Sequence, residues 1–283
     1  MMLVTTKKLL LDAQKGGYAV GAFNVENMEM VQAVAAAAEE LKSPIIMQTT
    51  PGTLKYADAD YFFANAKVAA KKASVPIAIH LDHGNSYDLA VQAFNAGYTS
   101  IMIDGSHESL EDNIALSKAV VDVCHIGDVP VEGELGKVGG KEDDLVAGYD
   151  DPYTNPDEAK LFVEKSGIDF LAVAIGTAHG VYKGIPKLDL NRLSEIRKVV
   201  DIPLVLHGTS GVPDDVVKEC IKRGICKVNY ATDLRIAFSN GVKKYLAEKP
   251  SVYDPKKYGA VGREEVKKYV LDKIKVLVSD FKA

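Results

Sequence analysis

Three histidines each follow a different apolar segment at the point where that segment ends. They are His83, His179 and His207. Three imidazoles around a fourth, open position form a ligand set typical of a catalytic divalent metal, with zinc as the first choice. Three unrelated polar residues at segment ends would give the same spacing. The pattern therefore indicates a metal site if the three segments end on one face of the fold.

Carboxylates accompany these histidines. Asp82 directly precedes His83, while Asp104 and Glu134 end two other apolar segments and could orient the imidazoles or offer an alternate metal position. In an alternating strand, His80 lies on the same face as Asp82 but one layer lower. That placement favours a hydrogen-bonded core residue over a metal ligand at His80.

Two short segments are typical of phosphate binding. HGTS (207–210) and NYAT (229–232) follow the last two apolar runs. Gly208 lets backbone N–H groups approach an oxyanion, and Ser210 and Thr232 add hydroxyl donors. Because Gly-Thr-Ser also makes ordinary turns, the place of these segments in the fold decides between the two interpretations.

These residues need a scaffold that brings many strand ends together. Eight parallel strands with helices outside them close into a barrel whose strand ends share one face. The sequence predicts this α/β fold, a single (β/α)8 TIM barrel over residues 1–283. A doubly wound open sheet is the alternative, disfavoured because no G-x-G-x-x-G follows the first run. The eight apolar runs lie at 18–23, 43–48, 75–80, 99–103, 129–135, 169–175, 202–208 and 226–231.

Two segments interrupt the regular repeat. Residues 136–155 form a connection rich in glycine and aspartate after the fifth run, and connections of that length are typical of active-site lids. Residues 248–262 place proline and glycine between two helical segments. We therefore expect a long active-site loop after the fifth strand and an extra C-terminal helix.

Composition excludes several function classes. A net charge of −5, with both signs mixed along the chain, argues against a nucleic-acid partner. No segment approaches the roughly 20 apolar residues of a membrane span, so no membrane association is expected. The 3 cysteines lack paired spacing and indicate buried free thiols in a reducing cytoplasm.

The chain resembles the class II, metal-dependent ketose-bisphosphate aldolases over essentially its whole length. Members of that family fold as (β/α)8 barrels and reversibly cleave a ketose 1,6-bisphosphate to dihydroxyacetone phosphate and glyceraldehyde 3-phosphate. The resemblance implies a lyase of carbohydrate metabolism. The matching motifs are AFN (22–24), HLDHG (80–84), MIDGSH (102–107), VEGELG (131–136), GGKEDD (139–144), AIGTAHG (174–180), LVLHGTSG (204–211), KVNYATD (227–233) and YDPKKY (253–258).

The resemblance assigns roles to the candidate site residues. It implies that His83, His179 and His207 hold a zinc ion that stabilises the enediolate left by carbon–carbon cleavage. It also implies that Asp82 is the base on the C4 hydroxyl and that Glu142, on the long loop, exchanges the proton at C3. A monovalent cation (Na⁺ or K⁺) and a homodimer or homotetramer are further implications.

The resemblance also implies which residues bind the sugar bisphosphate. Asn24 and Thr50 would line the pocket, and Asp254 and Lys256 would hold the far phosphate. Arg235 matches a residue that a neighbouring subunit contributes. The residues implied for the dihydroxyacetone phosphate half are Gly180, Gly208, Thr209, Ser210, Asn229, Tyr230, Ala231 and Thr232.

Two positions depart from the family pattern. Lys256 stands where the family has arginine, so a bidentate phosphate fork becomes a point charge. Ala231 stands where many fructose-specific members have aspartate, and N-x-A-T recurs in the tagatose-bisphosphate branch. These departures lean slightly towards tagatose 1,6-bisphosphate, with the fructose-1,6-bisphosphate aldolase of glycolysis as the alternative.

Two other function classes compete with the aldolase. A metal-dependent hydrolase on the same barrel usually carries an H-x-H pair after the first strand, where this chain has Asn24-Val25-Glu26. A non-catalytic scaffold subunit of an aldolase complex is disfavoured, because the chain carries the three histidines and Asp82 together.

Overall fold

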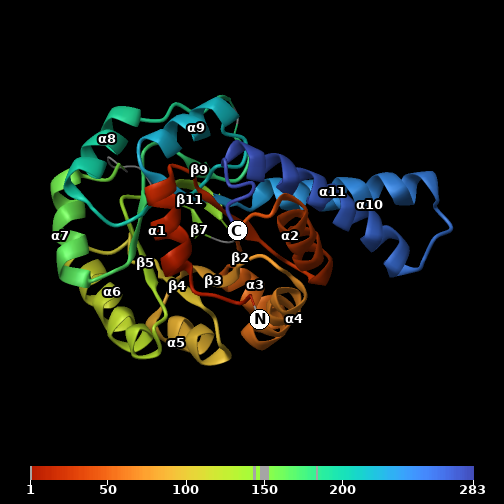
Figure 1. Ribbon diagram of the computed structural model, residues 1–283, viewed down its shortest axis with the longest axis horizontal. Coiled ribbons are helices and arrows are strands. Elements are labelled where there is room, and N and C mark those ends of the chain that lie inside the picture. Colours follow the sequence, from red (N-terminus) through yellow and green to blue (C-terminus); the bar gives the residue numbers. More distant parts are fainter. Residues whose placement is uncertain (1, 143–144, 147–152, 183) are drawn as a thin grey trace.

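Eight parallel strands close into a barrel in the computed structural model (Figure 1). The structure describes residues 2–142, 145–146, 153–182 and 184–283. The predicted (β/α)8 barrel is confirmed, and the open doubly wound sheet is wrong because the last strand pairs with the first. In order around the barrel, the strands are β1 (Val20–Asn24), β2 (Ile45–Thr49), β3 (Ile77–Gly84), β4 (Ser100–Ile103), β5 (Val131–Leu135), β8 (Phe170–Val173), β10 (Leu204–Leu206) and β11 (Ile225–Tyr230).

Helices surround the barrel, and their starts follow from local sequence. Asn27, Ser86 and Ser109 each accept a hydrogen bond from the backbone N–H three residues on, which is the usual N-cap arrangement. Asn155 does the same immediately before Pro156, which suits the first helical position. The surrounding helices are α2 (Met28–Leu41), α3 (Pro51–Ala57), α4 (Ala59–Lys72), α5 (Tyr87–Ala96), α6 (Leu110–Cys124) with the 3₁₀ turn η1 (His125–Gly127), α7 (Pro156–Ser166), α8 (Leu190–Val199) and α9 (Asp214–Lys222).

The apolar core has two layers because strand residues alternate between two faces. In β3, Ile79 packs outward under the helices, whereas Ala78 faces the barrel interior. The helix α1 (Thr6–Gly16) lies across the N-terminal end of the barrel and buries Leu10 and Ala13 against the interior cluster (Figure 1). The C-terminal ends of the strands are thereby left as the end where a site can open.

The predicted loop after β5 contains short strands. They are β6 (Gly139–Glu142) and β7 (Leu145–Val146), and β6 also pairs with β9 (Ala178–His179). Gly140 lies opposite His179, and a Cβ at Gly140 would lie 2.2 Å from the His179 carbonyl oxygen. The base of this connection is therefore attached to the segment that carries His179. Residues 143–144 and 147–152 of the predicted loop lie outside the described residues.

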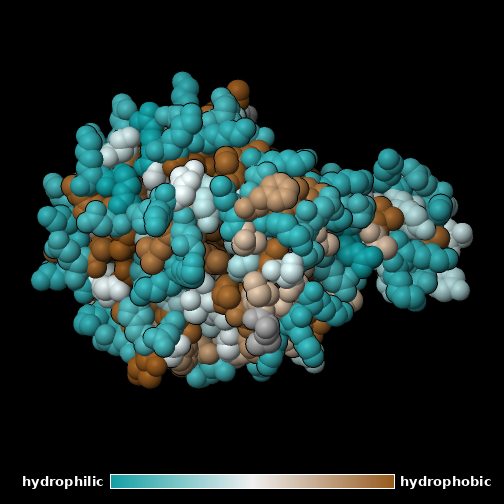
Figure 2. Space-filling model, in the orientation of Figure 1, coloured by the Kyte–Doolittle hydropathy of each residue, from teal (hydrophilic) through white to brown (hydrophobic). Residues whose placement is uncertain are grey.

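A helical hairpin, called the arm below, projects from the barrel (Figure 1). It consists of α10 (Thr232–Glu248) and α11 (Pro255–Val276), and α11 packs along α2. The two helices approach closely at Gly262, where a Cβ would lie 2.6 Å from the Phe238 ring. The face of the arm seen in Figure 2 is mostly hydrophilic. In the described ranges, every helix is too short or too polar to cross a bilayer.

The C-terminal end of β3 departs from regular strand geometry. Neighbouring side chains of a regular strand point to opposite faces, so Asp82 and His83 should not both face the barrel mouth. The register between β3 and β4 shifts between Leu81 and Gly84, and His83 has a left-handed backbone with a φ of 50°. This bulge turns His83 to the side that Asp82 faces. Gly84 permits it, because a Cβ there would lie 2.5 Å from the Met102 carbonyl oxygen.

We expect Gly84→Ala to destabilise the protein. Its methyl group would meet the Met102 backbone, which cannot rotate away, so the free energy of unfolding should fall by about 1–3 kcal/mol. Gly184→Ala is the matched control, since nothing lies within 4 Å of a Cβ at that position. Urea unfolding of the metal-free proteins, followed by circular dichroism, measures both. Equal stability of the two variants would show that the bulge does not require Gly84.

Candidate metal centre

His83, His179 and His207 meet at the C-terminal end of the barrel. The ring centroid of His83 lies 4.9 Å from that of His179 and 4.6 Å from that of His207. The centroids of His179 and His207 are 6.1 Å apart. One ring nitrogen from each lies within 4.8 Å of the other two. The three segment ends identified in the sequence therefore come together in space.

Carboxylates orient two of these imidazoles. His83 Nδ1 lies 2.7 Å from Asp104 Oδ2, and His207 Nε2 lies 2.9 Å from Glu132 Oε1. The other two ring nitrogens, His83 Nε2 and His207 Nδ1, face each other at 2.8 Å. A neutral imidazole carries its proton on the nitrogen next to the carboxylate and turns its lone pair the other way. This arrangement is what a divalent cation requires of histidine ligands.

A buried carboxylate oxygen provides a test of whether the residues fit a cation. Glu134 Oε2 is buried, and among the described residues it has no hydrogen-bond partner. It lies 3.9 Å from His83 Nδ1 and 3.7 Å from His207 Nδ1. An unpaired carboxylate oxygen in such a place is costly unless a cation neutralises it. The residues fit a metal on the three imidazoles, or one displaced towards the second ligand group formed by His83, Asp104 and Glu134.

Burial sets the protonation of this cluster. It lowers the pKa of His207 well below its usual range, and the charges of His83 and Lys227 add to that shift. Burial raises the pKa of Glu134 well above its usual range, and the Asp104 carboxylate adds to it. Burial also opposes ionisation of Asp104, but the hydrogen bond and charge of His83 outweigh it and lower that pKa. Opposite shifts in neighbouring carboxyls are typical of functional sites.

Three side-chain amides hold the Asp82 carboxylate in place. Its Oδ2 accepts hydrogen bonds from Asn24 Nδ2 at 2.9 Å and from Gln48 Nε2 at 3.0 Å. Its Oδ1 accepts one from Asn229 Nδ2 at 3.0 Å. Asn229 Nδ2 also lies 3.2 Å from His207 Nε2, so the carboxylate stands directly beside the imidazole cluster.

A narrow pocket opens beside Asp82 and His179. Gly180 and Gly208 have φ values of 92° and 63° there, a backbone geometry that suits glycine. The N–H of Asp233 donates to Ser210 Oγ at 3.3 Å, which joins the loop after β10 to the first turn of α10. An anion fits such a helix start. The lining is Asn24, Asp82, His179, Gly180, Gly208, Thr209, Ser210, Asn229, Ala231, Thr232 and Arg235.

Four of the residues implied for the substrate lie outside this lining. Strand alternation turns the Tyr230 side chain outward, where it stacks on Phe23 with ring centroids 5.8 Å apart, and a contact of Tyr230 with the substrate stays a prediction. Thr50 is buried and caps the start of α3. Asp254 and Lys256 form an ion pair of 3.0 Å at the start of α11, at the outer end of the arm (Figure 1).

Arg235 lies in the pocket, whereas Glu142 lies on the connection after β5. Arg235 lines the pocket of its own chain from the first turn of α10, so no neighbouring subunit is needed to bring it there. Its guanidinium pairs with Glu26 Oε1 at 2.7 Å. Glu142 is the last residue of β6, and its side chain lies outside the described part of the structure. Its role in proton exchange stays a prediction.

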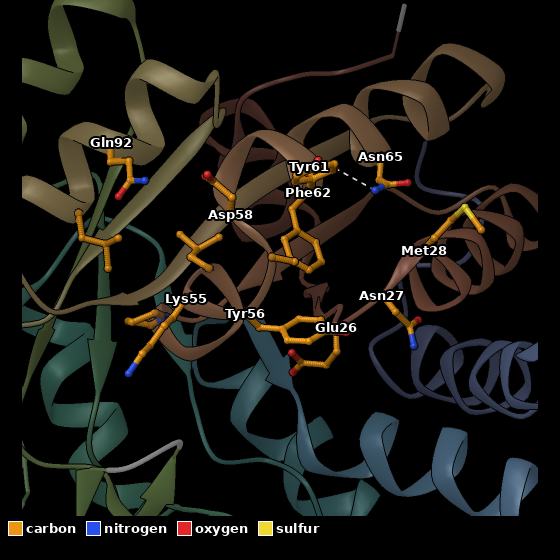
Figure 3. Close-up of a pocket in the computed structure, with 14 residues that line it drawn as sticks. Glu26, Asn27, Met28, Lys55, Tyr56, Asp58, Tyr61, Phe62, Asn65 and Gln92 are labelled. Carbon is orange, nitrogen blue, oxygen red and sulfur yellow. Dashed lines mark hydrogen bonds between the residues drawn. The ribbon is translucent and has the colours of Figure 1, made fainter. Parts of the chain in front are cut away.

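Glu26 also lines a larger hollow of about 920 Å³ (Figure 3). Tyr56 and Tyr61 contribute to its wall, together with Asp58 at the start of α4. Within the described ranges, the lining of this hollow includes neither the three imidazoles nor the Asp82 carboxylate. The ion pair between Glu26 and Arg235 therefore forms the boundary between this hollow and the pocket.

Sequence reasoning missed three residues that shape the site. Gln48 alternates inward next to the strand end, a signal that the period of two could have revealed. Lys227 is a lysine within an apolar run, which is a visible anomaly. Tyr182 gave no signal, although its hydroxyl accepts from Ala178 N at 2.6 Å and donates to Gly208 O at 2.7 Å. It ties together the loops that carry two of the histidines.

Comparison with known proteins agrees with this geometry. Residues 4–282 match the model of the family "Fructose-bisphosphate aldolase class-II". The YdjI aldolase from Escherichia coli K12 is 39% identical over 100% of both chains, with a TM-score of 0.89. A putative fructose-1,6-biphosphate aldolase from Coccidioides immitis is 32% identical, with 97% of this chain and 96% of that chain covered and a TM-score of 0.88. Fructose-bisphosphate aldolase from Campylobacter jejuni is 25% identical, with 99% and 97% covered and a TM-score of 0.85.

We expect His80 to make the metal-free protein less stable in acid. Burial lowers its pKa well below 6.5, and the charge of Lys227 adds to the shift. Below the His80 pKa of the unfolded chain, only the unfolded form binds this proton. The contribution of His80 to the free energy of unfolding therefore falls by about 1.4 kcal/mol for each unit by which the pH is lowered. The slope of unfolding free energy between pH 6 and 5 should be smaller by that amount in His80→Asn.

His107→Asn, which changes an exposed histidine, is the control for this measurement. Urea titrations at several pH values give the slopes. A His80→Asn slope equal to that of the parent protein would contradict a buried neutral imidazole.

Proposed function

The chain belongs to the class II fructose-bisphosphate aldolase family, and on that premise we propose that it reversibly cleaves a ketose 1,6-bisphosphate to dihydroxyacetone phosphate and glyceraldehyde 3-phosphate. One observation carries the proposal: the Asp82 carboxylate is fixed by three amides beside three converging imidazoles. Such cleavage needs one group that takes a hydroxyl proton and another that stabilises the electron pair left on carbon.

The imidazoles of His83, His179 and His207 would hold a divalent metal, zinc first. When bound, such an ion polarises the substrate carbonyl and stabilises the negative charge on the dihydroxyacetone phosphate half. Asp104 and Glu132 support this by keeping the ring nitrogens of His83 and His207 in position.

Asp82 takes the proton from the C4 hydroxyl during cleavage and returns it during condensation. Its three amide partners keep the carboxylate from rotating, so it stays beside the ligand cluster without joining it. We assign the proton exchange at C3 to Glu142. The pairing of β6 with β9 supports this assignment, since it attaches the strand of Glu142 to the segment of His179.

The dihydroxyacetone phosphate half would lie over the loops after β8 and β10. Backbone N–H groups at Gly180 and Gly208, the Ser210 hydroxyl and the start of α10 are suited to its phosphate. Arg235 adds a positive charge at the edge of the pocket. A monovalent cation at these loops stays a prediction.

The far phosphate poses a different geometric problem. Asp254 and Lys256 lie at the outer end of the arm, apart from the pocket of their own chain (Figure 1). They would serve the pocket of a second copy, which agrees with the predicted homodimer or homotetramer.

The sugar configuration at C4 would depend on the wall that contains Ala231. This methyl group lines the pocket two residues after Asn229 and cannot accept a hydrogen bond. The pocket lacks at this point an acceptor that would favour one epimer strongly. We therefore propose that tagatose 1,6-bisphosphate is slightly preferred and that fructose 1,6-bisphosphate is also cleaved.

We expect Asp82→Ala to lose cleavage by 10²–10⁴-fold, the usual effect of removing a general base. It should still bind metal and dihydroxyacetone phosphate, because neither contact requires the carboxylate. Asp58→Asn, which removes a carboxylate from the neighbouring hollow, is the control and should keep normal activity. Triose phosphate release, metal content and ligand binding are the three measurements. Near-normal turnover of Asp82→Ala would remove Asp82 from the mechanism.

We expect both epimers to be cleaved, with the ratio of kcat/KM corresponding to roughly 1–3 kcal/mol at most in favour of tagatose 1,6-bisphosphate. Triose phosphate release from the two pure sugars, side by side, measures this ratio. A preference of several orders of magnitude for fructose 1,6-bisphosphate would contradict the role of Ala231.

A chelator should abolish the cleavage of both sugars, and added zinc should restore it. Activity that survives with no detectable metal would overturn the metal-dependent mechanism.

A further inference from the structure

A lysine and a glutamate form a fully buried ion pair in the barrel interior, one layer below Asp82. Lys227 in β11 and Glu132 in β5 both have side chains with 0% exposure. Lys227 Nζ lies 2.9 Å from Glu132 Oε2 and donates a hydrogen bond to Oε1 at 3.1 Å. Well-packed apolar residues usually replace such a pair without loss of stability. Stability alone therefore does not account for it.

The glutamate of this pair also contacts one of the three converging imidazoles. Glu132 Oε1 accepts a hydrogen bond from His207 Nε2 at 2.9 Å, which places the proton on Nε2. The opposite nitrogen, Nδ1, then turns its lone pair towards His83. Asn229 lies near the same Nε2 atom, but its amide donates to Asp82. Glu132 is thus the acceptor that defines the tautomer and the ring orientation of His207.

Lys227 in turn fixes Glu132. Besides Lys227 and the neutral His207 ring, His80 is a further basic side chain near the carboxylate, but its Nε2 lies 3.8 Å from Glu132 Oε2, which is beyond hydrogen-bond distance. The His80 ring is held at its other nitrogen by Ser100 Oγ at 2.7 Å. Lys227 is therefore the group that balances the charge of the buried carboxylate and keeps it aimed at His207.

We propose that Lys227 and Glu132 are positioning residues for metal binding, acting through His207. The inference rests on the proposed function, because it takes His207 to be a metal ligand. Carboxylates behind a histidine ligand fix its orientation and increase its basicity, and removing them typically lowers metal affinity roughly 10–100-fold. The competing explanation is that the pair only joins β5 to β11 across the barrel, in which case metal affinity would not depend on its charge.

The decisive variant replaces both charges with apolar side chains of similar size, Glu132→Leu with Lys227→Met. We expect zinc affinity to fall by roughly 10–100-fold in a metal-free protein that still unfolds cooperatively in urea. Competition with a chromophoric chelator measures the affinity of zinc for the apoprotein. The visible spectrum of bound Co²⁺ should shift as well, because the His207 ring loses its orientation.

A matched control removes a neutral buried pair from the barrel wall. Thr49 and Tyr98 are joined by a hydrogen bond of 2.8 Å between their hydroxyls. Thr49→Val with Tyr98→Phe should leave zinc affinity and the Co²⁺ spectrum unchanged. If the charge-free double variant does not fold, Glu132→Gln decides the question. It keeps an acceptor for His207 Nε2 and should still lower zinc affinity about 10-fold.

The outcomes separate this inference from the proposed function. Parent protein that binds zinc tightly, with a double variant that binds it equally well, would overturn the positioning role alone. Equal affinity in a folded Glu132→Gln variant would do the same where the double variant cannot be measured. Parent protein that binds no zinc would overturn the metal-dependent function and this inference with it.

Discussion

Two consecutive residues of β3 must face the barrel mouth together, and the bulge before Gly84 makes this possible. Without it, either Asp82 or His83 would point into the layer of helices. The left-handed backbone of His83 costs on the order of 1–3 kcal/mol for a residue with a side chain. Its hydrogen bond to Asp104 and the close fit of Gly84 against the Met102 carbonyl hold the conformation in place. The local strain therefore lies where the Asp82 carboxylate and the His83 imidazole meet.

The barrel interior changes from apolar to charged along its axis. Leu10 of α1 belongs to an apolar cluster at one end, and the lysine–glutamate pair forms a charged layer above it. Asp82 and His207 follow in the next layer towards the mouth. In this water-poor interior each charge acts strongly on its neighbours, so a polar residue in one layer constrains the next. The orientation of His207 is set by Glu132 from below and that of Asp82 by amides from the side.

The barrel could be predicted from the sequence because apolar runs and helix caps are local signals. The three histidines could be found for the same reason, since each follows such a run. The orientation of His83 could not, because it depends on contact with Met102 in a different strand. Lys227 was missed although a lysine within an apolar run is a visible anomaly, and its partner Glu132 is 95 residues away in the chain. The outward direction of the Tyr230 side chain could not be predicted from its motif either, because a motif match ignores which face of the strand a residue occupies.

In the described part of the chain, α1 packs across one end of the barrel, so small molecules reach Asp82 from the opposite end. Ion, sugar phosphate and both products would share a single passage. A sugar phosphate bound there would stand between bulk water and the imidazoles. Exchange of the ion with solvent and turnover of substrate would then exclude each other in time. An aldolase built this way would shield a bound metal from competing chelators for as long as it is saturated with substrate.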